Sequence, residues 1–555
     1  MSASESIPGG SEPDPASGSA ARSSATSSSH LARSAGVVGA ATMTSRVLGL
    51  MREQVLAYWF GASDAMDAFL VAFRVPNLVR DLFAEGAMSA ALVPTFSRTL
   101  ANEGKARAWQ LGNSVMNALV LVTGVFVVGA MVFAPTLIDW LAGDYASVPG
   151  KFELTVTLTR TMAPFLVLIA VAAACMGMLN SLNVFFIPAL SPAMFNVASI
   201  VVGVGLVPVA ITVGVQPILA MAIGTLVGGI GQVLLQWPPL RARGFRWSPR
   251  LDFSDPGLRR VLVLMGPGMV GLAATQLNVF VNTVVATGEG TGAVSWLGYA
   301  FRVMYLPIGL FGVSIATATT PALARLAAAA DTPRMRSTLA SAVALMLTLN
   351  VPATLGLVVL ATPIVRILFE RGSFGPADTA ATAAAVQLYA IGLVGYSVVK
   401  ILSPAFYALN RSRTPAAVGV AAVLLNAFLS VTTAPVFGYK GLAFSASIAA
   451  LFNAATLAFL LRRSLGGLEL ARVAATFGKV LVAALVMSAT AWWSEQWLGA
   501  LAPGASLTAQ SVRLGGAIAA AVTMLGVSAQ LLGIREFEEV RDGVLRRVRG
   551  MFGRT

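Results

Sequence analysis

The sequence has one cysteine, Cys175, and one histidine, His30. A lone cysteine excludes a disulfide framework within the chain and a multi-cysteine metal site. The histidine lies in a polar N-terminal segment, which argues against histidine catalysis and histidine zinc sites. No GxxxxGK[ST] sequence occurs, which argues against ATP hydrolysis at a P-loop. We therefore expect a protein that is not an enzyme and carries no cofactor.

Charge is also scarce. Charged residues make up 11% of the 555 residues, whereas 56% are hydrophobic and the mean hydropathy is +0.78. Soluble domains carry about 25% charged residues, so this composition predicts a polytopic membrane protein. The net charge of +14 does not indicate nucleic-acid binding, because the arginines fall mostly in short loops between apolar segments.

The apolar segments predict an all-α fold with fourteen transmembrane helices, at about 20 residues for each span. Basic loop residues gather on alternate sides, which predicts that both termini are cytoplasmic. The expected spans lie near 36–60, 66–98, 112–141, 155–181, 187–210, 214–238, 259–287, 294–324, 337–368, 380–408, 415–436, 440–462, 473–494 and 511–533.

An internal repeat divides the chain. AFRV occurs at 72–75 and 300–303, an offset of 228, and LN followed by PA occurs at 182–189 and 409–416, an offset of 227. Two matches at nearly one offset predict a duplicated six-helix unit, with parallel lobes around a cargo cavity. The predicted parts are a disordered tail (1–34), an N-lobe (35–240), a C-lobe (241–465), a C-terminal helix pair (466–534) and a basic tail (535–555).

Charged side chains interrupt the first two apolar segments, although a charge at the bilayer centre costs roughly 2.5–3.5 kcal/mol on insertion scales. The excess of arginine predicts a polar cavity for an anionic cargo, because the planar guanidinium binds phosphate through paired hydrogen bonds. Arg302, in the second AFRV, adds a cation from the other lobe. The charges in the first two segments are Arg46, Arg52, Glu53, Asp67, Arg74, Arg80, Asp81 and Glu85.

Spacing adds to this picture. Asp67, Arg74 and Asp81 are seven residues apart and Glu85 follows four residues later, so they share one helical stripe that faces protein or water. Arg80 has an alternative, structural interpretation as an internal partner of Asp81 and Glu85.

Four stretches resemble the MurJ (MviN) lipid II flippases of the MOP exporter superfamily, and the resemblance covers about 36–533. These stretches are SRVLGLMRE (45–53), PNLVRDLFAEGAMSAALVP (76–94), SWLGYAFRVMYLPIGLFGVSIATATTPAL (295–323) and LFERGSF (368–374). The resemblance implies alternating access, a groove for the polyprenyl tail at 466–534, and transport of lipid II, the undecaprenyl-pyrophosphate-linked disaccharide pentapeptide, to the outer leaflet of the bacterial cytoplasmic membrane for peptidoglycan synthesis. The family's headgroup positions match Ser45, Arg46, Arg52, Asp67, Arg80, Glu85, Ser295 and Arg302, and a secondary cavity set is Glu53, Arg74 and Asp81.

One departure concerns the driving ion. Members of the family with a sodium site use carboxylates where this sequence has Asn282 and Ser430, and Ala446 replaces a hydroxyl. Such a degenerate site, left with Asn426 and neutral neighbours, should hold sodium poorly. We therefore expect the membrane potential to drive transport.

Three alternatives stay open from the sequence. The same fold could carry another polyprenyl-pyrophosphate oligosaccharide. A cation-coupled drug exporter is less favoured, because it would need carboxylates and aromatic residues in its cavity rather than four cations. A scaffold for cell-wall synthesis proteins would leave the intramembrane charges unexplained. The expected partners are lipid II, membrane lipids and cell-wall synthesis proteins, without nucleic acid.

Overall fold

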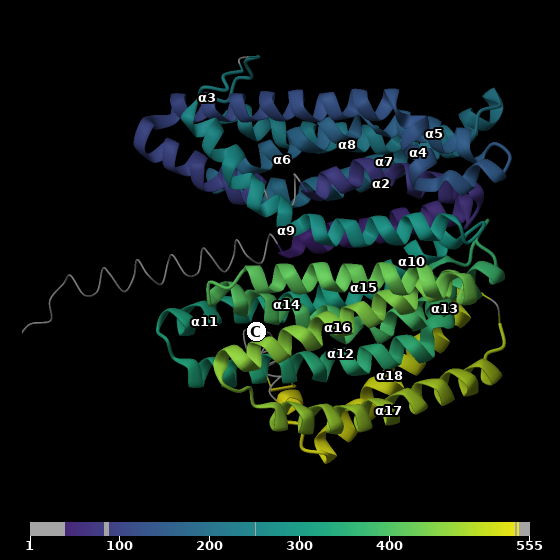
Figure 1. Cartoon of the computed structure of the whole chain (residues 1–555). Coiled ribbons are helices and arrows are strands. Elements are labelled where there is room, and N and C mark those ends of the chain that lie inside the picture. The colour runs from purple at the N-terminus through teal and green to yellow at the C-terminus, as the bar shows by residue number, and fades with distance from the viewer. Residues whose placement is uncertain (1–38, 83–87, 250, 505, 539–540, 543–555) are drawn as a thin grey trace, which may run out of the picture.

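A computed structural model describes residues 39–82, 88–249, 251–504, 506–538 and 541–542. No β-strand occurs in these residues, which form helices joined by short turns. Figure 1 shows the helices side by side in two groups, with α2 to α8 in one group and α10 to α16 in the other. Helices α17 and α18 lie on the far side of the second group (Figure 1). The predicted tail 1–34 lies outside the described residues.

The first group begins with a helix over residues 39–60. A kink at Gly104, where φ is 83°, divides α3 into two helices. Glycine suits this position because a positive φ is costly for residues with a Cβ. The remaining helices of this group are α2 (Asp64–Leu82), α3 (Met88–Val132), α4 (Ala134–Ala142), η2 (Gly143–Ser147), α5 (Lys151–Met162), α6 (Phe165–Ser181), α7 (Phe186–Val213) and α8 (Ile218–Ala242).

Helix α9 follows a connecting segment and lies between the two groups (Figure 1). The second group comes after it in the chain. A π-helical turn, η3, interrupts the helix that begins as α10. The helices are α9 (Pro256–Thr287), α10 (Ala293–Pro307), η3 (Ile308–Gly312), α11 (Val313–Ala328), α12 (Thr332–Phe369), α13 (Pro376–Ile391), α14 (Leu393–Ala408), α15 (Arg413–Phe437), α16 (Tyr439–Leu465), α17 (Leu470–Leu501) and α18 (Leu507–Leu531).

In the described part of the chain, ten helices are long and apolar enough to cross a membrane, or eleven if α13 and α14, which meet at a 40° bend, form one span. The other three predicted spans correspond to the helix over 39–60, to α2 with the start of α3, and to α9. The helix over 39–60 and α2 contain the intramembrane charges, which lower their hydropathy. The all-helical, multi-span fold class is confirmed, and the count of fourteen is consistent with the helices observed.

The two LN matches of the internal repeat form the same turn in the structure. Asn183 and Asn410 both have left-handed backbones, with φ of 59° and 56°. Each donates its N–H to the carbonyl three residues earlier, at 3.1 and 3.0 Å, and the following N–H reaches back five residues at 2.9 Å in both copies. Asparagine tolerates this conformation better than most residues, which explains its use at both helix ends. This turn supports duplication of one unit, while the domain limits stay a prediction.

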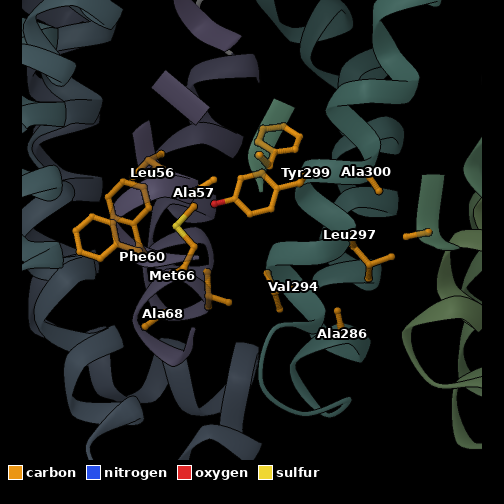
Figure 2. Packing of buried hydrophobic residues seen from close by; sticks show 14 of the residues in the cluster. Leu56, Ala57, Phe60, Met66, Ala68, Ala286, Val294, Leu297, Tyr299 and Ala300 are labelled. Carbon is orange, nitrogen blue, oxygen red and sulfur yellow. The ribbon is translucent and has the colours of Figure 1, made fainter. Parts of the chain in front are cut away.

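The two groups meet in a shared apolar core. Tyr299 of α10 points toward Leu56, Phe60 and Met66 from the first two helices, and all four are buried (Figure 2). The Tyr299 hydroxyl donates to the carbonyl of Gly61 at 3.2 Å, so its one polar atom is satisfied across the interface. This core fixes the helix over 39–60 against α10 and thereby positions the charged residues of both.

Candidate functional site

A buried carboxylate joins the two lobes at the centre of the predicted site. Oε1 of Glu53 accepts a hydrogen bond from Arg52 at 2.9 Å and forms a salt bridge with Arg302 at 2.9 Å. The Glu53 side chain is only 3% exposed, whereas Arg302 is 46% exposed. A buried carboxylate is tolerated when its charge is paired and hydrogen-bonded. Arg52 meets both conditions here, and Arg302 adds a second ion pair. We call Arg52, Glu53 and Arg302 the Arg302 cluster.

A small cavity adjoins the Arg302 cluster. Its volume is about 10 Å³, roughly the space that one water molecule needs. The guanidinium of Arg52 lies over the Phe195 ring at 5.2 Å, a cation–π contact. In this closed arrangement the cavity therefore has room for about one water molecule and not for a larger ligand. The lining residues are Arg52, Glu53, Leu56, Phe69, Leu70, Phe73, Ser199, Met221, Thr225 and Arg302.

Sequence reasoning missed the contribution of α7 and α8 to this cavity. Ser199 of α7 and Thr225 of α8 line the cavity, and Phe195 of α7 contacts Arg52 beside it. Small hydroxyl and aromatic residues are ordinary in apolar helices, so they give no signal comparable to a charge. They are also far from Arg52 in the sequence, so their place beside it depends on how α7 and α8 pack and could not be predicted from the sequence.

Arg46 reaches from the first helix to the second lobe. Its Nη1 lies 2.5 Å from the place where a Cβ on Gly309 would stand, so the glycine in η3 lets the Arg46 guanidinium lie directly against the backbone. π-Helical turns often occur at functional sites. The carbonyl of Ser45 accepts a hydrogen bond from Asn196 at 3.2 Å, so the backbone of Ser45, rather than its hydroxyl, makes this contact.

Arg80 is close enough for its charge to act on Arg52. The Asp81 side chain and the whole of Glu85 lie outside the described part, so the structural interpretation of Arg80 is not tested. Arg74 donates from Nε to the hydroxyl of Thr283 on α9 at 3.1 Å. The stripe that contains Arg74 therefore faces α9 at this position.

Asp67 is the centre of a second polar group. It is fully buried and accepts from the backbone N–H of Gly292 at 2.7 Å, from the N–H and hydroxyl of Ser295 at 3.0 and 2.6 Å, and from Lys151 at 3.2 Å. Lys151 also bonds Asp64 at 2.7 Å. We call Asp64, Asp67, Lys151, Thr291, Gly292 and Ser295 the Lys151 cluster.

The Lys151 cluster closes one end of the lobe interface. The Asp67 carboxylate caps the N-terminus of α10, where backbone N–H groups lack helical partners. Asp67 and Ser295, both predicted to contact the headgroup, bond to each other, and none of the four hydrogen bonds to Asp67 comes from a predicted arginine. Their headgroup role stays a prediction. Partial burial raises the pKa of Asp64, which precedes the predicted span, but hydrogen bonds from Lys151 and Thr291 outweigh it and hold the pKa below its usual value.

The degenerate ion site contains an internal hydrogen bond. Asn426 donates from Nδ2 to Oδ1 of Asn282 at 2.7 Å, and the hydroxyl of Ser430 donates to the same oxygen at 3.4 Å. Two donors therefore engage the Asn282 oxygen, whereas Oδ1 of Asn426 is buried without a hydrogen-bond partner among the described residues and is the one amide oxygen of the pair left open. Sodium needs several oxygen ligands and favours anionic ones, so these neutral residues do not fit it.

The comparisons with known proteins agree on one family. The family model described as "Lipid II flippase MurJ" matches residues 56–512. A probable lipid II flippase MurJ from Vibrio cholerae is 36% identical over 441 residues, covering 78% of this chain and 83% of that protein. The protein with the same name from Rhizobium meliloti is 33% identical over 519 residues, covering 92% and 95%.

Solved structures give the same result. The inward closed conformation of lipid II flippase MurJ has a TM-score of 0.73 and 26% identity, covering 89% of this chain and 99% of that one. An inward-facing multidrug resistance MATE transporter of the MOP superfamily has a TM-score of 0.65 at 14% identity, covering 78% and 98%, and so shares the fold alone. The resemblance in the sequence motifs is confirmed, and the chain belongs to the MurJ family of lipid II flippases.

Proposed function

We propose that this chain moves lipid II from the inner to the outer leaflet of the bacterial cytoplasmic membrane by alternating access. The observation that carries the proposal is the Arg302 cluster, in which cations from both lobes share a single carboxylate at 2.9 Å. A pyrophosphate carries more charge than one carboxylate and offers more acceptor oxygens, so it can engage both guanidinium groups together. Membership of the family supplies the identity of the cargo.

The two lobes supply different parts of the headgroup site. Arg46 and Arg52 come from the first helix and Arg302 comes from α10, so a bound pyrophosphate would bridge the lobes. Bidentate guanidinium contacts would orient it, which lysine cannot reproduce. The pair α17 and α18 packs on α12, at the far side of the second lobe, and would hold the polyprenyl tail. Both termini would be cytoplasmic, and the chain itself would catalyse no reaction.

The cavity arginines and the neutral ion-site residues support the membrane potential as the driving force of transport. It supplies about 2.3 kcal/mol for each charge moved through 100 mV, and the arginines of the cavity change their position relative to the field when the lobes rock. The occupied oxygen of Asn282 argues against a sodium-driven cycle.

Reconstituted protein tests the function directly. The full chain in proteoliposomes should move fluorescent lipid II to the opposite leaflet, and its expression should rescue cells depleted of their own lipid II flippase. A matched vesicle assay with another undecaprenyl-pyrophosphate oligosaccharide separates the two cargo classes. Transport of that lipid without transport of lipid II would replace the proposal with the oligosaccharide alternative.

A further inference from the structure

Two hydrogen-bond donors face the small cavity beside the Arg302 cluster without a partner. The hydroxyl of Ser199 and Nε of Arg52 are both buried, and neither has a hydrogen-bond partner among the described residues. Ser199 is 1% exposed, so bulk water does not satisfy it. A buried donor without an acceptor is costly in a folded protein, which makes two of them beside one cavity informative.

The free hydroxyl of Ser199 is unusual for its position. Serine and threonine in helices commonly donate to the carbonyl four residues earlier. Thr225, on the opposite wall of the cavity, does this with Met221 at 3.0 Å. Ser199 makes no such bond to Phe195, so its donor stays available to a ligand.

Neighbouring residues hold Ser199 in place. A Cβ on Gly228 of α8 would lie 2.5 Å from the Ser199 hydroxyl, so the absent side chain allows α8 to press against it. One turn before Ser199, Phe195 stacks on Arg52. Helix α7 therefore presents a ring and a hydroxyl, one turn apart, to the wall that contains the Arg52 guanidinium.

We propose that Ser199 is a binding residue for the phosphate oxygens of the transported lipid, acting together with Nε of Arg52. The proposal rests on the proposed lipid II transport and extends its site to α7. A phosphate oxygen suits the two donors, because it carries negative charge and accepts several hydrogen bonds at once. Oε1 of Glu53 is already engaged by Arg52 and Arg302. In the closed arrangement the cavity has room for one water molecule, and a phosphate oxygen would take the place of that water when the lobes open.

The substitution Ser199→Ala separates binding from folding. It removes a hydroxyl that has no partner in the free protein, so thermal stability should stay equal or rise. The same hydroxyl would donate to a charged oxygen in the complex, so the Kd for lipid II should rise about tenfold. The two readouts thus move independently, which a purely structural role of Ser199 would not produce.

The substitution Ser191→Ala is the matched control on the same helix. Ser191 is 4% exposed, donates to the carbonyl of Gln232 at 3.4 Å and accepts from Gln236 at 3.1 Å. Its removal leaves a partner unsatisfied, so thermal stability should fall while the Kd for lipid II stays unchanged.

The measurement uses the full chain in lipid nanodiscs, titrated with lipid II, and thermal unfolding of each variant. Ser199→Cys, which fills the position with a slightly larger group that donates only weakly, should also weaken binding and covers the case in which the alanine variant does not fold. Equal affinity of wild type and Ser199→Ala, or a loss of affinity that merely follows a loss of stability, would overturn the proposal. Failure of the wild type to bind lipid II would instead count against the proposed function.

Discussion

The Arg302 cluster and the Lys151 cluster connect the same two lobes through the same helix. In each, an acid of the first lobe reaches α10: Glu53 contacts Arg302, and Asp67 contacts Gly292 and Ser295. The partners differ in kind. Asp67 accepts from backbone, hydroxyl and ammonium donors, whereas Glu53 meets two arginines beside a cavity that also contains unpartnered donors.

This difference suggests a division of work. The Lys151 cluster places two carboxylates around one ammonium, so it stabilises the interface and leaves no positive charge for an anionic ligand. A carboxylate shared between two cations leaves positive charge for a cargo. We therefore expect damage to the Lys151 cluster to alter how the lobes close, and damage to the Arg302 cluster to alter what they bind.

The largest effect is expected from Arg46 and Arg302, which come from opposite lobes. Arg46→Ala and Arg302→Ala should each abolish rescue of flippase-depleted cells while the protein still inserts in the membrane. Lysine at either position should rescue only partly, because a point charge cannot bind phosphate bidentately. Rescue is scored at matched expression. Normal growth with both alanine variants would remove these two residues from the site.

The next effect concerns Asp67. Asp67→Asn should lower the free energy of unfolding by about 3 kcal/mol, because it leaves the buried Lys151 without one of its two charged partners. Asp64→Asn is the control, since the Asp64 side chain is 41% exposed and such a pair contributes about 0–1 kcal/mol. Thermal unfolding in detergent measures both. Similar losses from the two variants would argue against a special role for the buried carboxylate.

A smaller loss of stability is expected from Gly372, in the loop that contacts the end of the helix over 39–60. Ser373 donates its N–H to the carbonyl of Tyr58 at 2.8 Å, and the adjacent Gly372 has a φ of 60° and no room for a Cβ beside that carbonyl. Gly372→Ala should therefore cost about 1–2 kcal/mol of stability through strain at a positive φ. Gly375→Ala, in the same loop but with open space and φ of −92°, should be nearly neutral. Equal unfolding temperatures for the two variants would show that the contact adjusts freely.

The smallest effect is expected from the ion. Replacing sodium by potassium should leave lipid II transport in proteoliposomes nearly unchanged, because Asn282 already accepts from Asn426 and Ser430. Collapsing the membrane potential should slow transport. Asn282→Asp combined with Ser430→Asp should introduce a sodium-dependent gain in thermal stability. Strong sodium dependence of the wild type, with indifference to the potential, would reverse our interpretation of these substitutions.

Much of the fold could be predicted because its signals are local. Apolar length and loop charge predict the spans. The two AFRV copies predict a duplication, and the matching left-handed turns at Asn183 and Asn410 support it. The candidate site residues were inferred from charge and from the family motifs, and their role stays a prediction. Ser199 gives no such signal, and Lys151 resembles a loop cation in sequence, although the fold buries it between two carboxylates.

The division between binding and closing is tested most directly by one paired measurement. The Kd for lipid II is determined in nanodiscs for Arg302→Lys and Asp67→Asn beside the wild type. We predict a Kd at least tenfold higher for Arg302→Lys, about 1.4 kcal/mol of binding free energy, and a Kd close to that of the wild type for Asp67→Asn. Unchanged affinity in Arg302→Lys together with lost affinity in Asp67→Asn would contradict the account.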